Sequence, residues 1–147
     1  MMIDVLVIGT EPPCPRCDMV GRRVIEMAAS RKHITVRHCS FDSLEAQALG
    51  KRLMCTLGTA HHVAKDAGIP VNWDAVSEVI HRNRPLAVKD FRPADAWTPE
   101  LDALLKPCQA IAESLGYRMT PILVLNGEIK HHGSVPSHEQ IAAWLRG

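Results

Sequence analysis

The first forty residues alternate between two patterns of apolar positions. Residues 3–8 form a nearly continuous apolar run, which predicts a buried parallel strand. Apolar residues then recur at helical spacing, so we expect an amphipathic helix over residues 15–31, with Pro15 in its first turn. Residues 34–39 alternate strictly and predict a second strand. Strand, helix and strand in this order form a βαβ unit, whose two strands are parallel.

The C-terminal third predicts a β-hairpin followed by a helix. Residues 122–125 and 128–132 flank Asn126-Gly127, the dipeptide most typical of a tight hairpin turn. Ser137 and Gln140 have the spacing of a capping box, which marks the start of a last helix.

The middle of the chain, residues 42–97, has a helical pattern that glycine and proline interrupt. We expect an all-helical insertion here, with caps at Asp42 (paired with Glu45), Thr59 and Asp74. Residues 84–97 contain few periodic apolar positions and predict a long loop.

One more helix is expected to begin at Thr98-Pro99-Glu100 and to run toward Leu115, ending at Gly116. Pro107 should kink or divide this helix, because proline has no N–H to donate.

Length and composition exclude several classes of protein. The chain has 147 residues, which suits a single domain over residues 1–147. Its 17 basic and 16 acidic residues give a net charge of +1, so no nucleic-acid or membrane partner is expected. No apolar run reaches the roughly 20 residues of a membrane span. The N-terminus also lacks the pattern of a signal peptide, and we therefore expect a cytoplasmic protein.

The candidate chemistry lies in Cys14-Pro15-Arg16-Cys17, at the predicted turn from the first strand into the first helix. A cysteine at a helix N-terminus faces unpaired backbone N–H groups and the positive end of the helix dipole, and both favour the thiolate. We expect Cys14 at that position, and Cys17 one turn further in and more buried. Beside a βαβ unit this motif is typical of a redox pair. It also occurs in zinc sites, which need two further ligands.

Thr120-Pro121 stands directly before the strand predicted at residues 122–125. A proline at the first residue of a strand is ordinary by itself. Combined with the order of elements and the Cys-Pro-Arg-Cys motif, it makes the chain resemble the thioredoxin/glutaredoxin superfamily. Gly9-Thr10 and residues 133–137 are most similar to the small thioredoxin-like redox-active disulfide proteins. The resemblance covers about residues 3–40 and 98–146.

The resemblance implies an α/β, thioredoxin-like fold of βαβ, helix and ββα around a central mixed sheet, with the all-helical insertion at residues 42–97. It implies a thiol–disulfide oxidoreductase in which Cys14 is the nucleophile and Cys17 the resolving thiol. The separation of Cys17 from Pro121 is much longer than in the compact family, and residues 42–97 are the excess. We expect this insertion to be a lid or a partner-docking subdomain.

The resemblance also implies that Pro121 is the cis-proline beside the cysteines and that the backbone of Thr120 contacts substrates. The expected substrate-binding residues are Thr120, Pro121, Pro15 and Arg16. Substrates would be disulfides of proteins or of low-molecular-weight thiols, with a reductase or such a thiol as electron donor and no bound cofactor or metal. The chain departs from thioredoxin at Ile8, near the place of a buried acid, and at Pro13, in place of a tryptophan.

Two other classes stay open. A soft-metal (copper or zinc) protein, such as a metallochaperone, would use Cys14 and Cys17 with a histidine or Cys39. A thioredoxin-like scaffold would act through binding by the insertion.

A helix-turn-helix-like pattern at residues 59–80 lacks a basic recognition helix, so DNA binding is not expected. The remaining candidates are expected to be structural: buried Cys39, Cys55 and Cys108; surface His61, His62, His131 and His132; and core or interface Trp73, Trp97 and Trp144.

Overall fold

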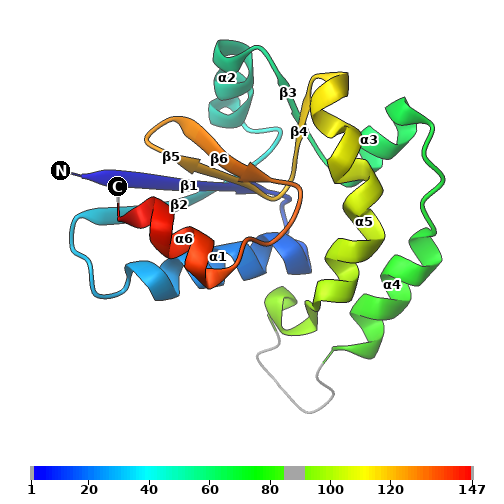
Figure 1. Cartoon of the computed structure of the whole chain (residues 1–147), viewed down its shortest axis with the longest axis horizontal. Coiled ribbons are helices and arrows are strands. Elements are labelled where there is room, and N and C mark those ends of the chain that lie inside the picture. Colours follow the sequence, from blue (N-terminus) through cyan, green and yellow to red (C-terminus); the bar gives the residue numbers. More distant parts are fainter. Residues whose placement is uncertain (1, 85–91, 147) are drawn as a thin grey trace.

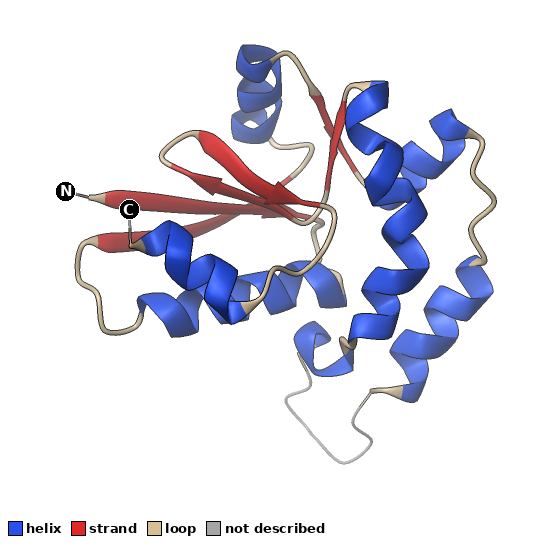
Figure 2. Cartoon of the chain, in the orientation of Figure 1, coloured by secondary structure: helices blue, strands red, loops and turns tan. Residues whose placement is uncertain are grey.

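The computed structural model describes residues 2–84 and 92–146, which form a mixed α/β fold around a central sheet (Figure 1; Figure 2). Its strands have the order β2-β1-β5-β6. The two strands of the βαβ unit are parallel, whereas β1 and β5, and β5 and β6, are antiparallel. The strand bounds are β1 (Ile3–Gly9), β2 (Ile34–Ser40), β5 (Ile122–Leu125) and β6 (Glu128–His132). This mixed sheet confirms the expected thioredoxin-like fold class.

Helices cover both faces of the sheet. Helices α1 (Pro15–Ala28) and α6 (His138–Leu145) lie on one face, and α2 (Leu44–Leu53) lies on the other (Figure 1). Side chains alternate along β1, so Val5 and Val7 pack toward α1 and α6, and Leu6 and Ile8 pack toward α2. Because both faces of β1 are covered, its sequence is a continuous apolar run.

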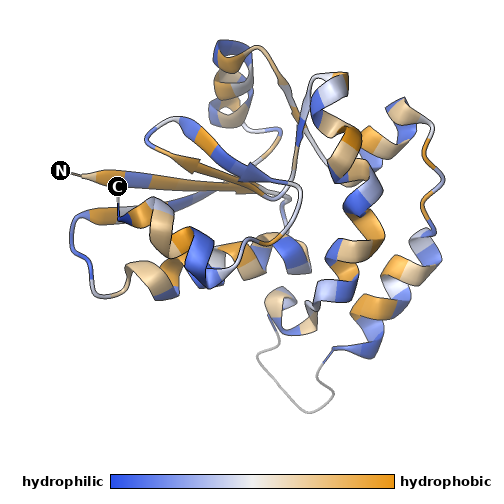
Figure 3. Ribbon diagram, viewed as in Figure 1, coloured by the Kyte–Doolittle hydropathy of each residue, from blue (hydrophilic) through white to orange (hydrophobic). Residues whose placement is uncertain are grey.

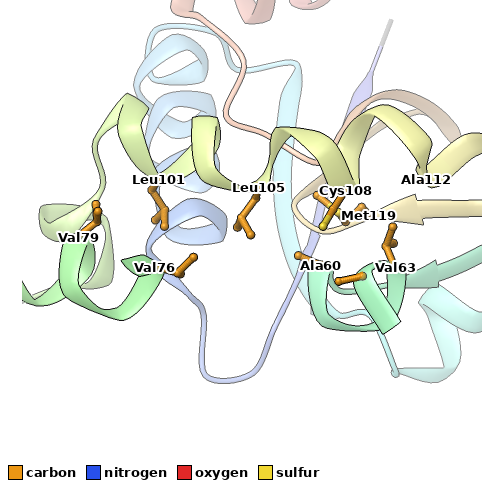
Figure 4. Close-up of a cluster of buried hydrophobic side chains, with 10 residues drawn as sticks. Ala60, Val63, Val76, Val79, Leu101, Leu105, Cys108, Ala112 and Met119 are labelled. Atoms are coloured by element: carbon orange, nitrogen blue, oxygen red, sulfur yellow. The ribbon is translucent and has the colours of Figure 1, made fainter. Parts of the chain in front are cut away.

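A second group of helices lies beyond the carboxyl end of β1. It consists of α3 (Ala60–Ala67), α4 (Trp73–Arg82) and α5 (Pro99–Ala112) (Figure 1). These helices share an apolar cluster in which Val76, Leu101 and Leu105 point into the space between α4 and α5 (Figure 4). Apolar and hydrophilic residues are mixed along each of them, as is usual for helices that bury one face (Figure 3).

The segment expected to be an all-helical insertion also contains a strand. Strand β3 (Thr56–Gly58) pairs in parallel with β4 (Tyr117–Met119), which leads directly to Thr120. The pattern missed β3 because three residues are too short to show alternation. The rest of the described segment is helical, ending in the short 3-10 turn η1 (Pro93–Ala96). Of the predicted loop at residues 84–97, residues 85–91 lie outside the described part of the chain.

Two of the predicted caps are wrong by one or two positions. The cap of α2 is Ser43 rather than Asp42, because the Ser43 hydroxyl accepts the N–H of Ala46. The cap of α4 is Asn72 rather than Asp74. In both cases a neighbouring polar residue competes for the same backbone N–H groups. The predicted caps at Thr59 and Ser137 are confirmed, and both form capping boxes.

The other local predictions can be compared element by element. The hairpin turn is formed by Asn126 and Gly127, which both have positive φ. Helix α5 continues through Pro107, so this proline does not divide the helix, and the alternative of a kink stays a prediction. The 3-10 turn η2 (Glu113–Leu115) then leads to Gly116, whose left-handed conformation ends the helical segment as expected.

Candidate functional site

The turn between β1 and α1 brings Cys14 and Cys17 together. The hydroxyl of Thr10 accepts the N–H of Cys14 at 3.0 Å and donates to the carbonyl of Pro12 at 2.9 Å. Cys14 is the N-cap of α1, with Pro15 as the first helical residue. Its sulfur accepts the N–H of Cys17 at 3.4 Å and lies 3.1 Å from the Cys17 sulfur. Both cysteines are free thiols.

The two thiols differ in exposure and in acidity. Cys14 is partly exposed, whereas the Cys17 residue is only 3% exposed. The pKa of Cys14 is lowered to about 6, chiefly because the Cys17 thiol donates a hydrogen bond to its sulfur. The backbone N–H of Cys17 and the positive charge of Arg16 lower it further, while burial opposes them. The pKa of Cys17 is raised by the same hydrogen bond and by burial. Cys14 is therefore the thiolate and Cys17 the protonated partner near neutral pH.

Gly9 makes room for Cys17. A Cβ atom at Gly9 would lie 2.7 Å from the Cys17 Cβ and 2.8 Å from its sulfur. The close approach of β1 to the start of α1 therefore needs a residue without a side chain at this position.

Arg16 is directed into the protein. It is 4% exposed, and its Nε donates to Asp102 of α5 at 2.8 Å. A second guanidinium nitrogen donates to the carbonyl of Gly133, and the other Asp102 oxygen accepts the N–H of Val135 at 3.1 Å. This ion pair joins the cysteine turn to α5 and to the segment before α6. The guanidinium is thus already bound by the protein.

Thr120 and Pro121 lie at the end of β4, next to the same turn. The peptide bond between them is cis, and both residues are buried. The N–H of Thr120 donates to the carbonyl of Gly58 at 2.8 Å, which extends the pairing of β3 with β4 by one residue. Of the Thr120 backbone groups, which were expected to contact substrates, the N–H therefore already has a partner within the chain.

A cavity of about 330 Å³ opens beside Cys14. Cys14, Pro15, Arg16 and Thr120 all contribute to its wall, whereas Pro121 does not line it. The opposite wall comes from the helices beyond the sheet, and its apolar members are Trp73, Val76, Ile80, Leu101 and Leu105. Trp73 stacks on His61, with ring centroids 3.7 Å apart. The structure thus brings three of the four predicted substrate-binding residues to one cavity with Cys14.

A smaller cavity of about 170 Å³ lies on the other side of the turn, against Cys17. Cys39 and Asp18 also line it. Both oxygens of Asp18 are occupied, because one binds Arg92 at 2.6 Å and the other accepts the N–H of Ala94 at 2.9 Å. Asp18 therefore fixes η1 against the first turn of α1.

The remaining cysteines are less acidic than Cys14. Burial raises the pKa of Cys39, Cys55 and Cys108 above the ordinary value. Cys108 belongs to the apolar cluster of the helical layer, as expected, but Cys39 and Cys55 are only partly buried. Across residues 2–84 and 92–146, no group of three or more histidine, cysteine or acidic side chains is arranged to hold a metal ion.

The histidine pairs differ from each other. His61 and His62 are exposed, as predicted. His131 and His132 are instead partly buried, because β6 is covered by Gln109, Glu113 and Trp144, and burial lowers the pKa of both histidines. The tryptophans pack as expected: Trp73 and Trp97 against the helical cluster, and Trp144 against the sheet cluster.

Three residues of the site were not among the predicted site residues, although Gly9 and Thr10 belong to a motif that carries the resemblance. Thr10 holds the turn through its hydroxyl, Gly9 provides space, and Asp102 neutralises Arg16. Asp102 lies 86 positions from Arg16, so only the tertiary fold brings the two together. Thr10 could have been found from its place at the start of a turn, because threonine hydroxyls bond the backbone two residues further on, as Thr10 does with Pro12.

Comparison with known families supports the same class of protein. The family model described as "Thioredoxin domain" matches residues 97–146, which hold α5, the β-hairpin and α6. No curated protein and no solved structure matched the chain. The family match, which covers about a third of the chain, and the mixed sheet support membership of the thioredoxin-like superfamily. A thioredoxin-like domain supports a redox-type function. In the described residues, no helix is both long enough and apolar enough to cross a bilayer.

Proposed function

We propose that this protein is a thiol–disulfide oxidoreductase whose reacting groups are Cys14 and Cys17. The observation that carries the proposal is the pair of sulfurs 3.1 Å apart at the N-terminus of α1, one a partly exposed thiolate and the other a buried thiol. A thiolate is the nucleophile of disulfide exchange, and a second thiol within reach can complete the reaction.

The exchange proceeds in two displacements. The Cys14 thiolate attacks one sulfur of a substrate disulfide, forms a mixed disulfide with that half and releases the other half as a thiolate. Cys17 then loses its proton and attacks the Cys14 sulfur, which forms the Cys14–Cys17 disulfide and releases the second half. The substrate gains two electrons and the protein loses them. A low-molecular-weight thiol or a reductase then returns the pair to the dithiol.

We propose that the substrate half bound to Cys14 lies against Pro15 and Thr120, because these residues share its cavity. Arg16 acts through its charge on Cys14, since Asp102 and Gly133 already bind its guanidinium. Pro121 acts by setting the position of Thr120. The soft-metal alternative has no specific observation in its favour within the described residues, where no third ligand accompanies the two cysteines.

Two variants test the proposal. Cys14→Ser should abolish reduction of a small disulfide, because no thiolate is left to attack. Cys17→Ser should accumulate a mixed disulfide at Cys14, which mass spectrometry detects as the added mass of one substrate half. Cys55→Ser is the matched control and should behave like the unmodified protein, because Cys55 is partly exposed and lines neither cavity beside the motif. Full turnover by Cys14→Ser, or no adduct with Cys17→Ser, would refute the proposal.

A further inference from the structure

The pairing of β3 with β4 occupies one edge of β4, next to the cysteines, at which an extended peptide could otherwise add. A peptide that adds to a sheet needs a strand edge with free N–H and C=O groups. Here β3 runs along β4, and the N–H of Thr120 is bound to the carbonyl of Gly58 at 2.8 Å. At the other end of the same ladder, the N–H of Thr56 donates to the carbonyl of Gly116 at 2.8 Å. The chain's own strand thus occupies the edge of β4 that carries the N–H of Thr120.

The cavity beside Cys14 offers a different kind of recognition. Its volume of about 330 Å³ falls at the lower end of the roughly 300–1,000 Å³ of small-molecule sites. Such sites are mainly apolar with a few polar groups. The apolar wall here comes from α4 and α5, and Val76, Leu101 and Leu105 are held in place by the cluster behind them (Figure 4). A rigid wall of this kind can bind an apolar group without first having to order its side chains.

The described residues that line the cavity offer no free permanent charge with which to bind a charged substrate. Among the described residues that line it, Arg16 is the one with a permanent charge, and its guanidinium is bound to Asp102 and Gly133. His61 is the other titratable side chain besides Cys14, and its ring is stacked on Trp73. A carboxylate placed here would lie near the Cys14 thiolate and would gain no permanently charged partner from the described lining residues, which is unfavourable for a charged group.

We propose that the substrate of this site is a low-molecular-weight disulfide that carries an uncharged apolar group. This inference rests on the proposed disulfide exchange and adds the class of substrate to it. One sulfur of the substrate meets the Cys14 thiolate, and its apolar group lies against Trp73, Val76 and Ile80. Cys14 forms a bond to that sulfur while the S–S bond breaks and the other half leaves as a thiolate. The Cys17 thiol then gives up its proton and displaces the bound half, and the protein ends as the Cys14–Cys17 disulfide.

Two disulfides of similar length but different charge test the proposal directly. Dibutyl disulfide is apolar and uncharged, and dithiodipropionate carries two carboxylates. For each disulfide we measure the rate at which it oxidises the reduced protein and divide this by the rate at which the same disulfide oxidises free dithiothreitol. The ratio removes the difference in intrinsic reactivity between the two disulfides. We expect the normalised rate for dibutyl disulfide to be higher by about tenfold or more. The normalised rate at which insulin oxidises the reduced protein, measured in the same way, should be lower than the normalised rate for dibutyl disulfide.

A matched pair of variants locates the preference. Ile80→Ala removes part of the cavity wall, and Ile111→Ala removes the same atoms from a partly buried isoleucine of the same helical layer that does not line the cavity. Ile80→Ala should lower the rate with dibutyl disulfide by about tenfold and leave dithiodipropionate unchanged. Ile111→Ala should change neither rate.

The outcomes separate this inference from the proposed function. Equal normalised rates for the two small disulfides, or a preference for insulin that Ile80→Ala does not alter, would overturn the apolar small-molecule substrate and leave disulfide exchange in place. Failure of every disulfide to oxidise Cys14 and Cys17 would overturn the proposed function itself. The substrate preference is measured on the unmodified protein, so the test holds even where a variant fails to fold.

Discussion

Replacement of Cys17 by alanine tests the electrostatic account of the site most directly. The hydrogen bond from the Cys17 thiol is the largest of the interactions that lower the pKa of Cys14. Cys17→Ala removes that donor but keeps the backbone N–H that lies 3.4 Å from the Cys14 sulfur, and it keeps Arg16. We therefore expect the pKa of Cys14 to rise only part of the way to its ordinary value.

The size of the rise follows from the structure. A fall in the pKa of Cys14 from 9.0 to about 6 corresponds to about 4 kcal/mol in favour of the thiolate. A hydrogen bond to a charged group contributes about 1.5–3 kcal/mol, which equals about one to two pKa units. The pKa of Cys14 in Cys17→Ala should accordingly be about 7–8. At pH 7 the thiolate then falls from roughly nine-tenths of the molecules to half or fewer.

The assay is the rate of alkylation of Cys14 by iodoacetamide as a function of pH, followed by mass spectrometry of the peptide that contains Cys14. The alkylation rate of a thiol follows its thiolate fraction, so the midpoint of the curve is the pKa. The unmodified reduced protein should show a midpoint at about pH 6. Cys108→Ala is the matched control, because it removes a buried thiol of the helical cluster, and its midpoint should stay at about pH 6.

Two results would refute this reasoning. One is a midpoint near 9 in the unmodified protein, since the N-terminus of α1 and the Cys17 thiol would then not stabilise the thiolate. The other is an unchanged midpoint in Cys17→Ala, since the dominant interaction would then be something other than the hydrogen bond between the two sulfurs.

Two further predictions concern the packing around the motif. Asp102→Asn leaves the buried guanidinium of Arg16 without its charge partner, and it should lower the free energy of unfolding, measured with urea, by about 3–5 kcal/mol. The matched change Asp95→Asn affects a more exposed ion pair and should lower the free energy of unfolding much less. Equal losses in the two variants would contradict this account. Gly9→Ala should displace Cys17, because the new Cβ would lie 2.7 Å from the Cys17 Cβ, and should slow the oxidation of the reduced protein by small disulfides. Gly21→Ala meets only the end of an exposed histidine ring, which can rotate away, and should leave that rate unchanged.

Local sequence patterns were sufficient for the elements that carry the motif. The apolar run of residues 3–8, Pro15 after Cys14 and the Asn126-Gly127 turn each depend on neighbours within a few positions, and the structure has the corresponding strand, helix start and hairpin. Position at the helix N-terminus likewise follows from sequence. The Cys17 thiol chiefly lowers the pKa of Cys14, and the backbone N–H of Cys17 in the first turn of the helix lowers it further.

Long-range contacts could not be predicted in this way. The three residues of β3 show no alternation, and their role depends on β4, about sixty positions away. Arg16 was expected to contact substrates, but its charge is bound by Asp102, which no spacing rule connects with the motif. The wall of the cavity is another such feature, because Ile80 and Leu101 meet Cys14 only after α4 and α5 have packed together.

The sequence by itself determined that two cysteines lie at the start of a helix after a buried strand, because capping, periodicity and turn formation act between near neighbours. Only the tertiary structure decided what surrounds them. Packing of the helical layer against the end of the sheet pairs Arg16 with Asp102, binds the N–H of Thr120 to Gly58 and leaves an apolar cavity beside Cys14. These contacts join segments far apart in the chain, and their energies depend on burial that no local pattern specifies.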